Sequence, residues 1–180
     1  MRWPRPSSTG CGIFQARRVA KVRRVLGVDP GLRITGYGCV EVREHGRVRL
    51  IEAGVFRFKA GLSVSRRLAE LDHDLGEALD RLAPDVVAVE KLFAHYNHPR
   101  TAIIMGHGRG VILLGVERAG RTLVELSPNE VKRSLTGHGH AGKEQMQDAV
   151  RAALGLPARP EPPDVADALA IAMCAASRSP

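Results

Sequence analysis

The sequence has few cysteines, no long apolar run and no acidic residue among its first 24 positions. Its three cysteines, Cys11, Cys39 and Cys174, are far apart and odd in number, which excludes a disulfide scaffold and a C-x-x-C metal site. A reducing cytoplasm is therefore the expected compartment. No apolar stretch approaches the ~20 residues that a membrane span needs, so we expect neither a membrane segment nor a membrane partner.

The remaining composition is that of a soluble folded chain. With 180 residues and 44% apolar content, the chain suits one domain with a hydrophobic core. Residues 1–21 carry scattered arginines and two prolines without an apolar period, which predicts a disordered basic tail. They also lack the apolar core of a secretory signal. One hypothesis is that translation starts at Val22 from a non-AUG codon, leaving residues 22–180 as a single domain.

The basic charge is concentrated in two places. The net charge is +8, and residues 1–24 alone carry seven basic residues and no acid. Most of the basic excess is therefore in the tail, and a high isoelectric point is weak evidence that the domain binds nucleic acid. Residues 91–143 carry eight basic and three acidic residues, which is better evidence for a polyanionic partner.

The pattern of apolar residues predicts a mixed α/β domain. Three strands separated by turns favour an antiparallel meander, and later strands alternate with helices. Leucines recur every three or four residues after Ser63, which predicts a helix, and Ser127 to Glu130 form a capping box. The expected strands are 24–28, 34–42, 48–58, 86–89 and 122–126, and the expected helices are 64–82, 101–119, 128–136, 143–154 and 164–176.

Four acidic residues occupy element ends that suit a common site. Asp29 follows the first strand, Glu90 follows a buried strand, and Asp164 and Asp167 share one face of the last helix. Ligands of open α/β sheets gather at the carboxyl ends of strands. Converging carboxylates repel one another unless cations neutralise them, so this set predicts two Mg²⁺ ions, with Mn²⁺ as a substitute.

Each acid also has a simpler explanation. Asp29-Pro30-Gly31 is a common turn, Glu90 can end a strand at solvent, and Asp164 can cap a helix. The combination is more specific than its parts. Two ions ~4 Å apart can activate water and stabilise the leaving oxygen of a phosphodiester. We therefore expect hydrolysis of a phosphodiester bond.

Four segments resemble successive blocks of one family. They are VLGVDPGLRITGYG at 25–38, VEKLF at 89–93, VKRSLTGHGHAGK at 131–143 and DVADALAIA at 164–172. This series is similar to RuvC, the bacterial Holliday-junction resolvases, over residues 22–176. The resemblance implies a ribonuclease-H-like mixed sheet with helices on both faces. It also implies a homodimer that nicks four-way junctions symmetrically in DNA recombination and repair, and a RuvA–RuvB branch-migration complex as partner. It assigns the same four acids as metal ligands and catalytic residues.

The resemblance also indicates DNA contacts. Lys132 and Lys143 match family lysines near the junction backbone, so we expect them to bind phosphates, although solvated surface lysines are the alternative. Phe93 and Tyr96 follow Glu90 in a loop and can stack on unpaired bases, as the family phenylalanine at the position of Phe93 is thought to do. The alternative for Phe93 is burial in the core.

Further positions carry smaller predictions. Arg100 and Arg109 are expected to add positive charge to the DNA-facing side. Lys91 departs from the family, which commonly has glutamine after the glutamate. The helix expected at 101–119 is apolar on much of its surface and contains several glycines, so part of it is expected to form the dimer interface.

Two other functions fit parts of the sequence. An actin-like kinase also starts with a strand, an aspartate and a glycine-rich turn, but it needs two large lobes and no equivalent of Asp164 and Asp167. A non-catalytic junction-binding module would have little use for four converging acids.

Overall fold

A computed structural model describes residues 22–31, 33–43, 46–92 and 99–178. In this part of the chain five strands form one sheet, in the order β3-β2-β1-β4-β5, and five helices flank it. The elements are β1 (Arg23–Asp29), β2 (Ile34–Val42), β3 (Val48–Arg57), α1 (Val64–Leu82), β4 (Val86–Glu90), α2 (Pro99–Arg118), β5 (Thr122–Leu126), α3 (Pro128–Thr136), α4 (Lys143–Leu154) and α5 (Pro163–Arg178).

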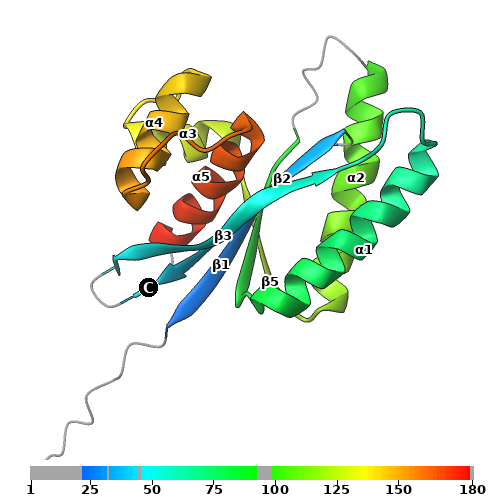
Figure 1. Ribbon diagram of the computed structural model, residues 1–180, viewed down its shortest axis with the longest axis horizontal. Helices are drawn as coiled ribbons and strands as arrows, with labels where there is room; N and C mark the ends of the chain where they lie inside the picture. Colours follow the sequence, from blue (N-terminus) through cyan, green and yellow to red (C-terminus); the bar gives the residue numbers. More distant parts are fainter. Residues whose placement is uncertain (1–21, 32, 44–45, 93–98, 179–180) are drawn as a thin grey trace, which may run out of the picture.

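The sheet confirms the predicted mixture of strand directions. β1, β2 and β3 pair antiparallel as a meander, whereas β1 with β4 and β4 with β5 pair parallel. Figure 1 places α1 and α2 on one face of the sheet and α3, α4 and α5 on the other. The predicted α/β fold with helices on both faces is therefore confirmed, and the element ends differ from the expected ones by no more than two residues.

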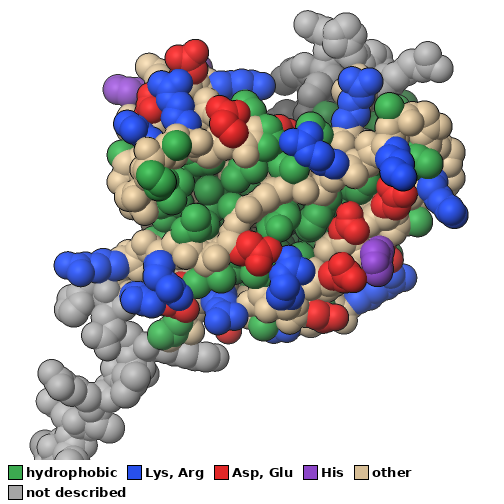
Figure 2. Space-filling model, in the orientation of Figure 1, with side chains coloured by type: hydrophobic (Ala, Val, Ile, Leu, Met, Phe, Trp, Pro, Cys, Tyr) green, Lys and Arg blue, Asp and Glu red, His purple; other side chains and the backbone are tan. Residues whose placement is uncertain are grey.

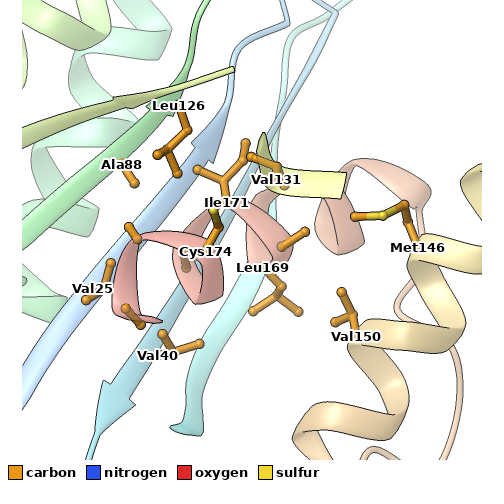
Figure 3. Close-up of a cluster of buried hydrophobic side chains, with 14 of the residues drawn as sticks. Val25, Val40, Ala88, Leu126, Val131, Met146, Val150, Leu169, Ile171 and Cys174 are labelled. Atoms are coloured by element: carbon orange, nitrogen blue, oxygen red, sulfur yellow. The ribbon is translucent and has the colours of Figure 1, made fainter. Parts of the chain in front are cut away.

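Alternate residues of β1 and β4 belong to two different cores, as the period of a strand requires. The core beneath α1 and α2 takes Leu26, Val28, Val87 and Val89, and the core beneath α5 takes Val25, Val86 and Ala88. Figure 3 shows the second core, where Val25, Val40 and Ala88 lie against α5. Asp29 and Glu90 come next along these strands, so the same alternation directs both acids toward the α5 side.

Helix α5 lies directly on the backbone of β1 and β2. A Cβ atom on Gly27 would lie 2.1 Å from the carbonyl oxygen of Ala168, and one on Gly36 would lie 2.1 Å from that of Asp164. A Cβ on Gly38 would meet the side chain of Leu169 at 2.6 Å. Only glycine fits at such distances, so three strand glycines set how closely α5 approaches the sheet.

The cysteines in the described residues are unpaired and buried, one in each core. Cys39 belongs to the core beneath α1 and α2, and Cys174 to the core beneath α5. Within the same described part, no helix combines the length and the apolar character required to cross a membrane.

Candidate active site

The four predicted acids meet at one edge of the sheet. The parallel register pairs Val28 with Val89, so Asp29 and Glu90 follow at the carboxyl ends of adjacent strands. Asp164 and Asp167 occupy the first turns of α5, which rests on the neighbouring strand β2. The charges of Asp167, Glu90 and Asp164 all raise the pKa of Asp29, so these three side chains lie within electrostatic range of it.

This crowding makes the acids hard to ionise. Burial, followed by the three neighbouring carboxylates, raises the pKa of Asp29 to about 7. Burial and the charge of Asp167 raise the pKa of Glu90 to about 7 as well. The pKa of Asp167 is also raised, chiefly by burial. The site therefore favours a positive charge placed among its oxygen atoms.

Two lysines provide part of that positive charge. Lys143 opposes the rise in pKa of Asp29 and Asp167, and Lys132 does the same for Glu90 and Asp167. Lys132 lies in α3, and Lys143 is the first residue of α4. Both lysines therefore lie within electrostatic range of the acids, and their expected contact with DNA phosphates stays a prediction.

Local capping interactions fix the starts of the two lysine-bearing helices. Ser127 donates its backbone N–H to the Glu130 carboxylate at 2.7 Å, and Glu130 donates its own to the Ser127 hydroxyl at 3.3 Å. The Ser127 hydroxyl also donates to the Glu130 carboxylate, at 2.7 Å. This bond, the bond from the Ser127 backbone N–H and the neighbouring Arg178 lower the pKa of Glu130 to about 2. Gly142 caps the start of α4, and its N–H donates to the Gln145 side chain at 2.9 Å.

The side chain of Arg109 forms contacts within the protein. Its Nε donates to the Glu90 carbonyl oxygen at 3.2 Å, and its guanidinium forms an ion pair with Glu125 of β5. The side chain thereby ties α2 to the ends of β4 and β5, beside a predicted ligand. Its charge is thus neutralised within the chain, in contrast to the DNA-facing role expected for it. The 19-residue separation from Glu90 gave no sequence signal for this contact.

A second tether holds the segment that enters α5. The buried Gln147 of α4 donates its amide to the Pro160 carbonyl at 3.1 Å and to the Glu161 carboxylate at 3.0 Å. Arg159 forms a bidentate salt bridge with Asp148, with N···O distances of 2.8 and 2.6 Å. Helix α4 therefore holds the proline-rich connection immediately before Asp164, a role that its composition did not reveal.

Some predicted DNA contacts cannot be placed. Phe93 and Tyr96 lie outside the described residues, and so does the tail at 1–21. Arg100 lies in the first turn of α2, but its side chain is outside the description. Lys91 is exposed, and its backbone N–H donates to the Leu126 carbonyl at 2.8 Å, which extends the β4–β5 pairing by one bond.

The adjacent strand-end carboxylates have the oxygen donors that a hard divalent cation prefers. In the described residues, no three or more Asp, Glu, His or Cys side chains form a metal-binding cluster. Mg²⁺ does not require one, because it commonly takes one or two carboxylates and completes its shell with water and substrate phosphates. Paired carboxylates with raised pKa values match that requirement.

A mixed sheet that ends in adjacent carboxylates, with two more on a helix packed against it, defines a ribonuclease-H-like nuclease. A family model described as "Crossover junction endodeoxyribonuclease RuvC" matches residues 25–175. The chain belongs to this RuvC family of crossover junction endodeoxyribonucleases. That membership removes the actin-like kinase and the non-catalytic module from consideration.

Individual relatives agree with the assignment. A crossover junction endodeoxyribonuclease RuvC of Rhodopirellula baltica is 47% identical over 150 residues, which cover 83% of this chain and 84% of the relative. The Thermus thermophilus RuvC structure is 36% identical, with a TM-score of 0.75 and coverage of 84% and 92%. The structure of T. thermophilus RuvC in complex with Holliday junction substrate is 32% identical, with a TM-score of 0.76 and coverage of 84% and 91%.

The raised pKa values predict how stability depends on pH without metal. In the unfolded chain Asp29 and Glu90 lose their protons near pH 4, whereas in the folded chain they keep them up to about pH 7. Between these values the folded state binds more protons, so these groups make the protein less stable as pH rises. Asp29→Asn or Glu90→Gln should therefore raise the free energy of unfolding of the metal-free protein more at about pH 8 than at about pH 5. The difference between the two pH values should be on the order of 1 kcal/mol.

Urea unfolding in chelator at the two pH values measures this difference. Asp148→Asn is the matched control, because Arg159 lowers the pKa of Asp148 and that carboxylate stays ionised at both pH values. An equal stability change at both pH values for the Asp29 and Glu90 variants would contradict the assignment of crowded acids.

Proposed function

We propose that this chain resolves four-way DNA junctions by hydrolysing two phosphodiester bonds symmetrically, with two divalent ions at each active site. The observation that carries the proposal is the meeting of Asp29, Glu90, Asp164 and Asp167 at one sheet edge. The family assignment and the junction complex of the Thermus thermophilus relative support the choice of substrate.

The proposed ion ligands are the four acids. Asp29 and Glu90 are fixed by the β1–β4 register, and Asp164 and Asp167 by the packing of α5. When bound, two Mg²⁺ ions, or Mn²⁺ in their place, would supply activation of a water and stabilisation of the leaving 3′ oxygen. The chain contributes by keeping two pairs of oxygen donors in place before the substrate arrives.

Lys132 and Lys143 are assigned to DNA binding and not to the metal ions. Lys132 and Lys143 lie close enough to influence the acids, yet neither forms an ion pair within the described residues. A lysine is a compact point charge that suits a phosphate oxygen. Lys143 also begins α4, where the backbone N–H groups at the helix start favour an anion. We assign both to the phosphates that flank the bond to be cut.

Replacing the central acids should abolish cleavage and preserve binding. Asp29→Asn and Asp167→Asn remove negative charge without changing shape, so cleavage of a synthetic four-way junction in Mg²⁺ should fall by about 10²–10³-fold or more. Junction affinity in chelator should stay at the wild-type level. Asp72→Asn, an exposed acid of α1, is the control and should cut normally. Wild-type cleavage by either active-site variant would refute the ligand assignment.

We also propose that the active form is a homodimer that pairs through α2. Ile103 is 60% exposed and Leu114 is 48% exposed. They lie 11 residues apart, which is about three helical turns, so they share one face. Gly106 and Gly110 lie between them on this face, and a Cβ on either would meet no atom within 4 Å. Glycine costs about 1 kcal/mol inside a helix, so two exposed glycines between apolar residues favour close approach of a partner helix.

Charges on that face should separate the dimer. Ile103→Asp with Leu114→Asp would bury two carboxylates in the interface, raising the dissociation constant by more than about a hundredfold. Val22→Asp, an exposed apolar position at the start of the described chain, is the control. Sedimentation velocity gives the result, and a dimer unaffected by the double variant would exclude α2 as the interface.

The finer partner assignments follow from the family. Two active sites related by a twofold axis suit two strands of a junction. We assign Phe93, Tyr96 and Arg100, which follow Glu90 in the chain, to the junction centre, and a RuvA–RuvB branch-migration complex to the same reaction. The free, buried thiols of Cys39 and Cys174 favour action in a reducing cytoplasm.

A further inference from the structure

The described residues contain a second group of basic side chains at the active-site end of the sheet. Arg33 precedes β2, Arg57 ends β3, Lys59 lies in the following turn and Arg66 lies in the first turn of α1. All four are exposed. We call these four residues the β3–α1 patch. Figure 2 shows basic side chains along the upper right margin of the molecule, where Figure 1 draws the β3–α1 connection.

Backbone pairing makes the patch continuous. Ile34 pairs with Arg57 across β2 and β3, and the Phe58 N–H donates to the Arg33 carbonyl at 3.2 Å. The Leu62 N–H donates to the Lys59 carbonyl at 3.4 Å, which closes the turn that leads into α1. The four cations therefore come from one sheet corner and from the turn attached to it.

Within the described residues, no acid pairs with the patch. No acidic residue occurs between Glu52 and Glu70. In the part of the chain that the structure describes, none of the four patch residues forms an ion pair. Arginines elsewhere do so: Arg81 pairs with Glu52, Arg118 with Asp72, and Arg159 with Asp148.

The start of α1 departs from the usual pattern of helix charges. Helix N-termini favour acids, yet the first turn of α1 has none and carries Arg66 instead. The Ser63 hydroxyl accepts the Arg66 N–H at 3.3 Å, so the helix starts normally. A basic first turn therefore opposes the helix dipole and adds to the positive potential of this corner.

The patch and the two lysines come from different elements near the acids. Strand β1, which ends in Asp29, is two strands from β3, a separation of about 10 Å in a sheet. Lys132 and Lys143 belong to α3 and α4, which cover the face of the sheet that carries α5. A DNA backbone that crosses the carboxylates and their ions could thus meet cations from both groups.

We propose that the β3–α1 patch binds the phosphate backbone of a duplex arm of the junction, as a contact surface separate from the active site. The inference rests on the proposed function and identifies where the substrate extends beyond the bond that is cut. Four exposed cations without acidic partners in the described residues suit a row of phosphates. Phosphate contacts do not distinguish one base from another. The contact should therefore strengthen binding without selecting sequence.

The test is the salt dependence of junction binding. The patch variant combines Arg57→Gln, Lys59→Gln and Arg66→Gln in the full chain. A fluorescent four-way junction is titrated in chelator between about 50 and 200 mM salt, where each lost phosphate contact lowers the slope of log Kd against log salt by about 0.9. The expected slope is lower by roughly 2 to 3, with affinity at the lowest salt at least tenfold weaker.

The control variant removes the same charge from the opposite end of the β2–β3 hairpin, through Arg43→Gln, Arg47→Gln and Arg49→Gln. Arg43 and Arg49 there pair with Glu41. Its slope should stay at the wild-type value. An unchanged slope for the patch variant, or an equal fall for the control, would overturn the proposal.

If wild-type protein cleaves the junction and the patch variant keeps its slope, only this inference fails. If wild-type protein neither binds nor cuts the junction, the proposed function fails.

Discussion

The contact of α5 with the backbone of β1 and β2 is the constraint on which the active site depends. Gly27, Gly36 and Gly38 leave room for the helix, and Ala168 adds little bulk at the contact. Because the Asp164 carbonyl lies against Gly36, the first turn of α5 is held at the ends of the strands. The strand register then supplies the other two acids from the same face of the sheet. Catalytic geometry here is a consequence of helix-on-sheet packing.

That packing brings negative charges together, and the positions of the basic residues reduce the resulting repulsion. Asp29, Glu90 and Asp167 have raised pKa values, and lysines of α3 and α4 oppose that rise without forming ion pairs in the described residues. Arg81, Arg118 and Arg159 form ion pairs with acids, whereas no residue of the β3–α1 patch forms one within the described residues. This uneven distribution leaves cations available where a polyanion and its metal ions would meet the protein.

Sequence reasoning succeeded where the signal was local or periodic. Strand and helix periods gave the elements, and the position of each acid at an element end predicted that Asp29, Glu90, Asp164 and Asp167 would meet. It failed for contacts between distant positions. Nothing near Arg109 indicates that it bonds the Glu90 carbonyl and Glu125, and nothing near Gln147 indicates that it holds the entry to α5. The strand glycines were visible in the sequence, but their role depends on which helix lies over them.

The most direct test of this account is the affinity for Mn²⁺, measured by calorimetry, of a Gly36→Ala variant. The added methyl group would meet the Asp164 carbonyl and displace the start of α5, at a cost of about 1–3 kcal/mol that a folded domain tolerates. Gly76→Ala in α1, where a Cβ meets nothing within 4 Å, is the matched substitution. The account predicts that Gly36→Ala folds but binds Mn²⁺ at least tenfold more weakly, while Gly76→Ala binds as wild type does. Wild-type Mn²⁺ affinity in a folded Gly36→Ala protein would contradict it.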